Sequence, residues 1–417
     1  MNEETAFAKN VQSWTKRIVD GGETDFRVLV GRLPGVDPSQ VTDALTALDI
    51  SWPNPVYRDI IRQARSTPNL VAASDWGPFV PHPLDFDWRF TRNTIEELSR
   101  TILAIARPER IALLGTPSLV SSLEIETPAS TLCLIERNPL WIHHLSGGHP
   151  NLEVIEADLS FLQVPSRLLG WADVVVADPP WYPAAQLAYM WAAAQLLRPG
   201  GFVLASIPPI GTRPGVAAER DAFNAHAESW GFSNPSVRPA ALRYRTPPFE
   251  LNALRAADIL ADLAEWRCGD LAVSRRTHAA TLHFPKIEKL VEEAWVEVCI
   301  NGVRIKIKQQ PREPVHSDSS SPKLLSLVDG DVLPSVSARH PVRADVDVWT
   351  SGNRVFKCKE SEAFIELCQN LRDNRVINLA EPRESPMDKR ISSLLKPAQR
   401  RLANLVSLEF DEYMRRP

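Results

Sequence analysis

The sequence of 417 residues predicts an α/β protein whose core is a mainly parallel sheet with helices on both faces. Three observations predict this fold. Short β-branched runs alternate with helical stretches between residues 85 and 284, which is typical of βαβ units. Helix signals fill residues 1–84, and an Asn-Gly hairpin signal lies near the start of residues 285–417. We therefore predict a helical N-terminal unit, a central α/β domain and a C-terminal α+β domain with these bounds.

The N-terminal unit has one clear helix start, at Asp37-Pro38, where Asp can cap the helix and Pro can take its first position. Val41, Leu45 and Leu48 then fall on one helix face. This pattern is typical of a helix-turn-helix or winged-helix unit that binds DNA. A small helical cap without that role gives the same pattern, and both interpretations stay open.

Five short apolar runs predict the strands of the central domain, at residues 111–114, 131–135, 152–155, 174–177 and 202–207. Nearly every run is continuously apolar, as expected for strands that are covered on both faces. In such a sheet, ligands bind beyond the carboxyl ends of the strands, where the strand order reverses. The residues that follow each run are therefore the candidate site.

A single glycine follows the first predicted strand. Gly115 permits the chain to turn tightly beneath a cofactor, and Thr116 comes next. A dinucleotide fingerprint has three glycines at fixed spacing, so this loop argues against NAD or FAD.

Carboxylates follow the second and third predicted strands. Glu136 is placed to accept hydrogen bonds from two ribose hydroxyls, and Asp158 to accept one from an adenine amino group. Each acid alone is equally well explained as an ordinary residue at a strand end. Their shared position beyond neighbouring strands favours a nucleoside site, with Arg137 and Leu159 beside them.

The strongest signal is Asp178-Pro179-Pro180-Trp181, directly after the run 174–177. Two prolines cannot continue a central strand, so they turn the backbone and direct Asp178 to the cleft. Transfer of an alkyl group to nitrogen requires an oriented amine. Asp178 and the neighbouring prolyl carbonyl can accept its N–H bonds, while Trp181 or Tyr182 stacks on a planar or cationic acceptor. A plain Pro-Pro turn closed by a core Trp is the alternative, since the chain has 35 prolines.

Two hairpins and two helices are predicted in residues 285–417. Asn301-Gly302 is the stronger hairpin signal, because both turn residues must take positive φ, and Ser351-Gly352-Asn353 gives a second. The predicted strands are at 295–300, 303–308, 346–350 and 355–359, and the predicted helices at 362–371 and 391–414. No catalytic motif lies in this part, which makes it a candidate surface for a protein partner.

The composition excludes several classes of protein. With 47 Lys and Arg against 51 Asp and Glu, the net charge is −4, so only a local basic groove could hold nucleic acid. Five cysteines are widely spaced and never form a Cys-x-x-Cys pair, so we expect reduced thiols, no disulfide framework and no metal site. No apolar run approaches the about 18 residues of a membrane span. We expect a cytoplasmic protein that needs no membrane.

The residues at the strand ends resemble those of the class I S-adenosylmethionine-dependent methyltransferases, in which an Asp-Pro-Pro-aromatic motif marks members that modify amino nitrogens. The resemblance implies a Rossmann-like fold. It implies that Asp178, Pro179, Pro180 and Trp181 hold the amine, and that the cofactor contacts Gly115, Thr116, Glu136, Arg137, Asp158 and Leu159. Gly200-Gly201 matches the turn from helix to fifth strand, where it would end the helix.

Residues 25–280 also resemble the branched-chain polyamine synthases, which transfer aminopropyl groups from decarboxylated S-adenosylmethionine. That family places a winged-helix segment first and then a Leu-Leu-Gly-x-x-x-Leu loop, matched here by residues 113–119. It carries acids after the loop glycine, where this chain has Thr116-Pro117-Ser118. A polyamine would therefore lose charge pairs worth about 1 kcal/mol each. An anionic or nucleic-acid acceptor would suit a group of arginines that also reads as a solvated face: Arg238, Arg243, Arg245, Arg275 and Arg276.

Three functions follow from these signals. The first is an S-adenosylmethionine-dependent transferase that methylates an amino nitrogen of a nucleic-acid base or a protein. The second is an aminopropyltransferase that uses the decarboxylated cofactor. The third is a degenerate methyltransferase fold that serves as a binding scaffold, a reading that the single loop glycine supports. A second copy of the chain is a further candidate partner.

Overall fold

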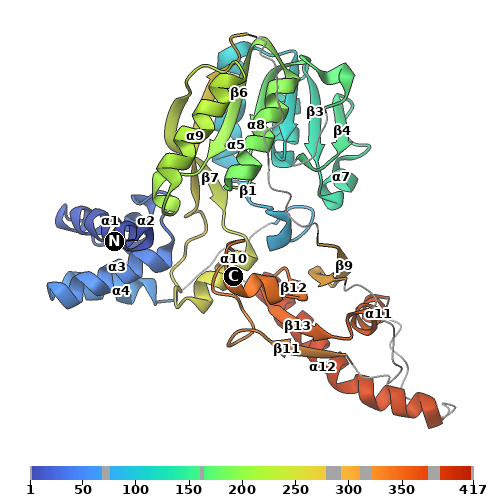
Figure 1. Ribbon diagram of the computed structural model, residues 1–417. Helices are drawn as coiled ribbons and strands as arrows, with labels where there is room; N and C mark the ends of the chain where they lie inside the picture. The colour runs from blue at the N-terminus through green and yellow to red at the C-terminus, as the bar shows by residue number, and fades with distance from the viewer. Residues whose placement is uncertain are drawn as a thin grey trace. The chain divides into compact units, whose positions relative to one another are not determined.

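The computed structural model describes residues 2–67, 76–159, 164–278, 293–309, 322–373 and 386–414 (Figure 1). The chain forms two compact units. The first comprises Met1–Ala64, Trp88–Thr246 and Leu263–Lys289, and the second Arg65–Asp87, Pro247–Asp262 and Leu290–Pro417. The N-terminal segment thus belongs to the same compact unit as the central sheet. A division into three domains at residues 84 and 284 stays a prediction.

The first unit begins with four helices: α1 (Glu3–Asp20), α2 (Phe26–Gly31), α3 (Pro38–Ser51) and α4 (Pro55–Ala64). The predicted helix start is confirmed, because Asp37 Oδ1 accepts the N–H of Ser39 at 2.9 Å and Pro38 takes the first position. Residues 2–67 contain helices only, so the strands of a winged helix are not among them. DNA binding by this segment stays a prediction.

The sheet of the first unit has eight strands in the order β1-β7-β8-β6-β5-β2-β3-β4. All five predicted strands are confirmed, and they pair in parallel. The strand order reverses between β2 and β5, which is where ligands bind in such sheets. The strands are β1 (Arg89–Phe90), β2 (Arg110–Leu114), β3 (Thr131–Glu136), β4 (Leu152–Glu156), β5 (Ala172–Ala177), β6 (Leu197–Ile207), β7 (Ser236–Arg245) and β8 (Cys268–Arg275).

Three strands at one edge are not among the predicted ones. β8 pairs antiparallel with both β6 and β7, and β1 pairs antiparallel with β7. β7 lacks the pattern of a buried strand because Pro239 interrupts it and its first four residues are exposed. Its register shifts between Arg238 and Leu242, where Ala240 has a φ of +50°.

Helices cover both faces of this sheet. Successive strand residues point to opposite faces, and Ile111 and Ala112 are both fully buried. Trp191 of α8 and Phe223 of α9 belong to one apolar core, together with alternate residues of the parallel strands. The helices are α5 (Arg92–Ala106), α6 (Val120–Glu126), α7 (Pro139–Leu145), α8 (Pro183–Leu196) and α9 (Val216–Ser229).

The prediction that Gly200-Gly201 ends a helix is wrong. Helix α8 ends at Leu196, and both glycines lie inside β6, with Gly200 at a φ of +88°. Arg276 explains the earlier end. Its buried guanidinium donates from Nη1 to the carbonyl oxygens of Leu197, at 2.6 Å, and Ala194, and so satisfies carbonyls at the end of the helix.

The second unit is an α+β structure around a five-stranded sheet in the order β11-β13-β12-β10-β9. Asn301 and Gly302 form the first predicted hairpin turn, with φ of +50° and +81°, and the second hairpin is confirmed as well. The strands are β9 (Trp295–Ile300), β10 (Val303–Lys308), β11 (Lys323–Ser326), β12 (Val348–Thr350) and β13 (Val355–Lys359). The helices are α10 (Pro248–Ala256), α11 (Ser361–Arg372) and α12 (Pro386–Met414).

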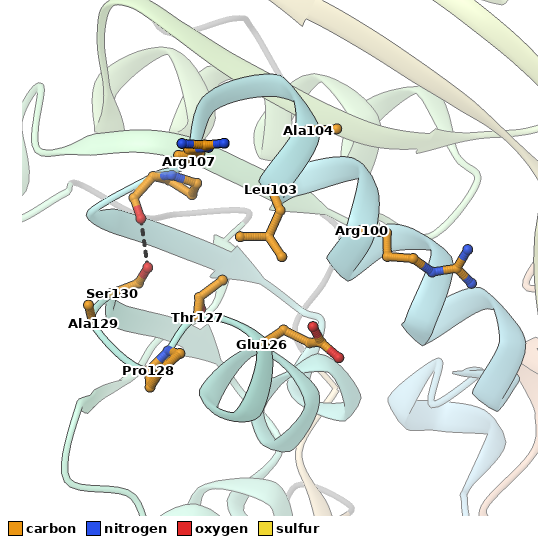
Figure 2. A pocket seen from close by; sticks show the side chains of 10 residues that line it. Arg100, Leu103, Ala104, Arg107, Glu126, Thr127, Pro128, Ala129 and Ser130 are labelled. Carbon is orange, nitrogen blue, oxygen red and sulfur yellow. Dashed lines mark hydrogen bonds between the residues drawn. The ribbon is translucent and has the colours of Figure 1, made fainter.

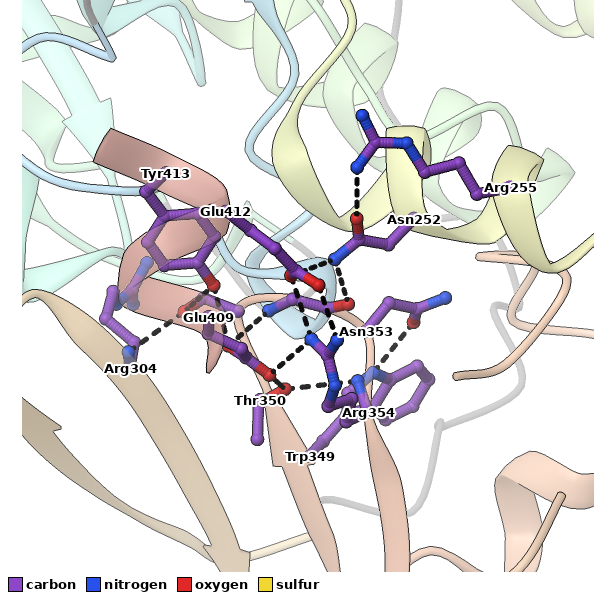
Figure 3. A network of polar contacts seen from close by, with 12 residues as sticks. Asn252, Arg255, Arg304, Trp349, Thr350, Asn353, Arg354, Glu409, Glu412 and Tyr413 are labelled. Carbon is purple, nitrogen blue, oxygen red and sulfur yellow. Dashed lines mark hydrogen bonds and ion pairs between the residues drawn. The ribbon is translucent and has the colours of Figure 1, made fainter. Parts of the chain in front are cut away.

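A buried polar network joins α12, α10 and the turn after β12 within the second unit (Figure 3). The Glu409 side chain is fully buried, and its Oε2 accepts the N–H of Gly352 at 2.9 Å and the hydroxyl of Tyr413 at 2.6 Å. Arg354 pairs with Glu409 Oε1 at 3.3 Å and binds both carboxylate oxygens of Glu412, at 3.0 and 2.6 Å. Burial raises the pKa of Glu409, and the charge of Arg354 opposes that rise.

The cysteines and the helices can be compared with the expected thiols and the expected lack of a membrane span. All five cysteines are free thiols, four of them buried. None of the helices in the described ranges has the length and apolar character that crossing a membrane requires.

Candidate active site

The predicted site residues lie at the carboxyl ends of four parallel strands, on both sides of the reversal in strand order. The backbone fixes their relative positions. The N–H of Gly115 donates to Ile135 O at 3.1 Å, and the N–H of Asp178 donates to Leu114 O at 3.2 Å. The N–H of Ala157 donates to Glu136 O at 3.0 Å. The loops after β2, β3, β4 and β5 are therefore joined in one layer.

The loop after β2 turns at Gly115, whose φ is +62°. A Cβ atom at this position would lie 2.9 Å from the hydroxyl oxygen of Tyr189 on α8, so glycine serves both the backbone conformation and the close approach. Thr116 follows and is only 2% exposed. Its hydroxyl is buried and has no hydrogen-bond partner in the described part of the chain. A buried, unsatisfied hydroxyl is costly, which is a reason to look for a bound polar group there.

Glu136 ends β3 and is held by its own loop. Its Oε1 accepts the N–H groups of Arg137 and Asn138, both at 2.8 Å. The Arg137 guanidinium also lies 3.6 Å from the carboxylate of Asp158, in a partly exposed ion pair. Leu159 is buried in the core beneath this loop. Glu136 and Asp158 thus lie at neighbouring strand ends, Glu136 held by backbone N–H groups and Asp158 beside a guanidinium.

Tyr189 of α8 is affected by the charges of all three acids. The charges of Glu136, Asp158 and Asp178 all raise the pKa of its phenol, in addition to the larger effect of burial, while Arg137 lowers it. The three acids follow three different strands, β3, β4 and β5. Sequence reasoning missed Tyr189, since a tyrosine in an Ala-rich helix gives no signal of a site.

A chain of hydrogen bonds runs from Trp181 to Asp178. Trp181 Nε1 donates to Ser206 Oγ at 3.1 Å, and Ser206 Oγ lies 2.7 Å from the hydroxyl of Tyr244, which donates to Asp178 Oδ1 at 2.7 Å. The indole N–H can only donate, so Ser206 accepts at that end. In the bond between Ser206 and Tyr244, either hydroxyl can donate. Tyr244 is the donor that this chain presents to the carboxylate.

The packing around Trp181 fixes the indole in place. A Cβ at Gly269 would lie 2.9 Å from Trp181 Cζ2, so the small residue makes room for the ring. The Tyr244 ring meets the indole edge to face, with centroids 5.9 Å apart. Pro179 is buried, and Pro180 O accepts the N–H of Tyr182 at 2.7 Å. Ser206, Tyr244 and Gly269 come from β6, β7 and β8, and sequence reasoning identified none of them as site residues.

Burial raises the pKa of Asp178 to about 7, although the hydrogen bonds from Tyr244 and Ser206 lower it. The pKa of Tyr244 lies well above its usual range, because of burial first and the charge of Asp178 second. Asp178 therefore changes its protonation state near neutral pH, and Tyr244 remains a donor. A carboxyl group in this state can accept a proton from an amine and release it again.

The arginines expected to form one basic group are separated by the structure. Arg276 is buried against the C-terminal end of α8. Arg275 is the last residue of β8, and its Nε donates to Gly200 O at 3.3 Å. Arg238 donates to the hydroxyl of Thr101 on α5 at 3.0 Å. Only Arg243 and Arg245 lie at the carboxyl end of β7, on either side of Tyr244.

A hollow of about 620 Å³ lies at the amino ends of the parallel strands, opposite the candidate site (Figure 2). It is lined by the ends of α5 and α6 and by the residues before β2 and β3, including Arg107 and Ser130. The Ser130 hydroxyl donates to Pro108 O at 2.6 Å and so ties two of these segments together. Because the predicted site residues follow the strands rather than precede them, this hollow is not the candidate site.

We expect Gly115→Ala to weaken binding of the cofactor that the sequence predicts about tenfold or more, since the added methyl meets Tyr189 and the backbone has positive φ. The control is Gly147→Ala. Gly147 also has a positive φ, of +97°, but a Cβ there meets no atom within 4 Å. Calorimetric titration with S-adenosylmethionine measures both variants. Equal losses of affinity in the two variants would mean that backbone strain, and not the close approach of Gly115 to Tyr189, controls cofactor affinity.

Comparison with solved structures finds the same fold. A mutein of the branched-chain polyamine synthase from Thermus thermophilus, solved with N4-aminopropylspermidine and 5′-methylthioadenosine, superposes with a TM-score of 0.52 at 14% sequence identity. The match covers 69% of this chain and 97% of that one. The parent synthase in the same complex gives a TM-score of 0.48 at 12% identity, over 68% of this chain and 92% of that one.

Methyltransferases also match over a smaller part of the chain. A variant of a 16S rRNA adenine methyltransferase from Catenulisporales acidiphilia aligns with 45% of this chain and 93% of its own, at 14% identity and a TM-score of 0.30. No family model matches the sequence, and no curated protein does. Together with the strand order, the match to the synthase confirms the predicted fold: a Rossmann-like methyltransferase fold with additional segments.

Proposed function

We propose that the first unit is an S-adenosylmethionine-dependent transferase that alkylates an amino nitrogen, with methyl transfer as the first candidate. One observation carries the proposal. Asp178, with a pKa near 7 and a fixed donor in Tyr244, lies at the reversal in strand order, beside the Gly115 loop and close to Glu136 and Asp158. The shared fold with a polyamine synthase supports it.

The residues present fit this cofactor. In this proposal Glu136, whose Oε1 accepts the N–H of Arg137, would accept from ribose hydroxyls, and Asp158, paired with Arg137, would accept from the adenine amino group. The glycine at position 115 lets the loop turn against Tyr189, and the buried Thr116 hydroxyl has no hydrogen-bond partner among the described residues. Arg137 fixes Asp158, and the buried Leu159 supports the loop. When bound, the cofactor would supply an electrophilic carbon on a sulfonium.

Asp178 has two roles in the proposed transfer. Its carboxylate accepts an N–H bond from the acceptor and so points the nitrogen lone pair at the electrophilic carbon, helped by the carbonyl of Pro179 and by stacking on Trp181. With the cofactor bound, an N–C bond would form as the C–S bond breaks, and the electron pair of that bond would stay on sulfur. The nitrogen then carries one proton too many. Asp178 takes up that proton and passes it to water, which its pKa near 7 permits.

Aminopropyl transfer is the second candidate, favoured by the match that covers 97% of the polyamine synthase chain. The same residues would serve it, since both reactions join an amino nitrogen to a carbon of a sulfonium. The two cofactors differ by one carboxylate, and their relative affinities therefore separate the two candidates.

The test is calorimetric titration of the full chain with S-adenosylmethionine and, separately, with its decarboxylated form. We expect tighter binding of the intact cofactor, weakened about tenfold or more in Glu136→Ala because the ribose loses its acceptor. Glu156→Ala is the matched control, since Glu156 is an exposed acid at the neighbouring strand end. Preference for the decarboxylated form would replace methyl by aminopropyl transfer. Binding of neither would contradict both and leave the scaffold function.

A further inference from the structure

Trp181 is held through its backbone as well as through its ring. Arg213 directly follows the short helix η5 (Ile210–Thr212), and its Nη2 donates to Trp181 O at 3.0 Å and to the carboxylate of Glu219 on α9. The two paired side chains are only 15% and 24% exposed. Since breaking a mostly buried ion pair is costly, the pair keeps the guanidinium in one place. The backbone of the predicted acceptor motif is therefore tied to the segment that follows β6.

The N-terminal loop (residues 33–36), which joins α2 to α3, packs tightly against η5. A Cβ atom at Gly211 would lie 2.6 Å from Pro34 O, and a Cβ atom at Gly35 would lie 2.5 Å from Thr212 Oγ1. Each segment thus has a glycine at the point where the other comes closest. The N-terminal loop therefore fixes the position of η5, and with it the residue that follows η5.

The N-terminal loop also contacts the start of β8. Burial raises the pKa of the Cys268 thiol, and a hydrogen bond from the backbone of Gly35 lowers it. The next residue, Gly269, is the one whose small size makes room for the Trp181 ring. The N-terminal loop thus contacts both segments that hold Trp181, one through its carbonyl oxygen and the other beside its indole.

The position of Trp181 matters for the proposed transfer, because its ring would stack on the acceptor while Asp178 holds the acceptor nitrogen. A misplacement of about 1 Å in a group that orients a reactant can lower the rate about a hundredfold. The proposed cofactor residues Gly115 and Glu136 follow β2 and β3 instead. A displaced η5 should therefore affect the acceptor side of the site and leave the cofactor side in place.

We propose that Arg213 is a positioning residue for Trp181, and that the N-terminal loop holds it in place, so that the N-terminal segment completes the acceptor side of the site. The inference rests on the proposed function, because it concerns the acceptor of the same transfer. It gives the helices of residues 2–67 a role in the transferase that requires no DNA.

The test follows the fluorine resonance of Trp181 in the full chain labelled with 5-fluorotryptophan. The chain has 12 tryptophans, and the resonance is assigned by its absence in Trp181→Phe. We expect Gly211→Ala to shift or broaden it, since the added methyl meets Pro34 O. Gly31→Ala is the matched control, because neither glycine has a positive φ and a Cβ atom at Gly31 meets no atom within 4 Å. We expect the control to leave the resonance unchanged.

Two substitutions of Arg213 test its bond to the carbonyl oxygen. Because Nη2 makes the bonds to both Trp181 and Glu219, the single ammonium of Lys can replace it, whereas Met cannot donate. We expect the Trp181 resonance to move in Arg213→Met and to return toward its original position in Arg213→Lys. Movement of all tryptophan resonances together would mean that Arg213 maintains the fold in general, and would overturn the proposal.

Calorimetric titration with S-adenosylmethionine completes the test. We expect Gly211→Ala and Arg213→Met to change cofactor affinity by less than about threefold, because the change is confined to the acceptor side. An unchanged Trp181 resonance in both variants would overturn the inference, as would equal shifts in Gly211→Ala and Gly31→Ala. A loss of cofactor affinity of about tenfold or more in both variants would overturn it as well.

Failure of the unmodified chain to bind the cofactor has a different meaning. It would overturn the proposed function, while the fluorine spectra would still decide whether the N-terminal loop positions Trp181. Cofactor binding with an unchanged Trp181 resonance in the variants would overturn only this inference.

Discussion

Replacing Asp178 by Asn is expected to abolish amine transfer, by about a thousandfold or more, while cofactor affinity stays within about threefold. Asn keeps the shape of the side chain and can still accept from Tyr244. It cannot take up the proton that the alkylated nitrogen must lose. Transfer is measured by incorporation of label from the cofactor, and affinity by calorimetry. Loss of both together would mean that Asp178 maintains the structure of the site and does not act in the transfer.

The pH profile gives the same prediction a second readout. Since the pKa of Asp178 is about 7, the carboxylate that accepts the N–H bond forms as the pH rises through 7, and the rate of the unmodified chain should rise with it. Tyr244→Phe removes a hydrogen bond that lowers this pKa. We expect its profile to shift to higher pH without loss of cofactor affinity. An unchanged profile would show that another group controls the rate.

The stability of the folded chain is expected to change with pH in the opposite direction to the rate. The pKa of Asp178 is raised from 3.8 to about 7, so between these values the folded chain binds more protons than the unfolded chain. Stability contributed by this group therefore falls as the pH rises from about 4 to 7. One pKa unit corresponds to about 1.4 kcal/mol, and solvent screening at this partly buried site reduces the sum. We expect Asp178→Asn to unfold at a higher temperature than the unmodified chain at pH 8.

The second large effect concerns the buried network of the second unit. Arg354→Ala removes the cation that pairs with both Glu409 and Glu412. A buried carboxylate left without its partner typically costs about 3–5 kcal/mol. We expect the free energy of unfolding measured in urea to fall by that amount. Arg372→Ala is the control, because Arg372 forms an exposed pair with Asp373 and its loss should leave the free energy of unfolding nearly unchanged.

The loss in Arg354→Ala should grow with pH. The pKa of Glu409 is already raised by burial, and without the guanidinium it would rise further, so at low pH the group can become neutral. The cost is then smaller at pH 5 than at pH 8. A small and pH-independent loss would contradict the assignment of Arg354 as the partner that keeps Glu409 charged.

The sequence predicts the parallel part of the fold well for a local reason. Strands 111–114 and 174–177 are continuous apolar runs, and the residues that follow such strands meet at one edge whatever the loops do. Glu136 and Asp178 were therefore placed at the right strand ends. β7 could not be identified in the same way, because Pro239 and an irregular register remove the pattern.

The rest of the candidate site depends on contacts between residues far apart in the chain. Tyr244 meets Asp178 only because β8 pairs with both β6 and β7, and no sequence spacing encodes that pairing. Arg267, whose guanidinium carbon lies 5.7 Å from the centroid of the Trp181 ring, reaches that ring for the same reason. The end of α8 was predicted too late in the chain for a similar reason, since Arg276 is distant in sequence from the carbonyl groups that it caps.

The path of the chain between β7 and β8 has a consequence for folding. The two strands are neighbours in the sheet, yet Pro247–Asp262 between them belongs to the second unit, where Asn252 of α10 donates to Gly352 O and Glu412 Oε2, both at 2.9 Å. The two ends of this segment are joined by a hydrogen bond from the N–H of Thr246 to Ala264 O, at 2.7 Å. The acceptor side of the candidate site is thus assembled from contacts of high sequence separation, which form late and slowly in folding. A nascent chain would complete the Gly115 loop and the Glu136 end of the cleft well before the residues that hold the acceptor.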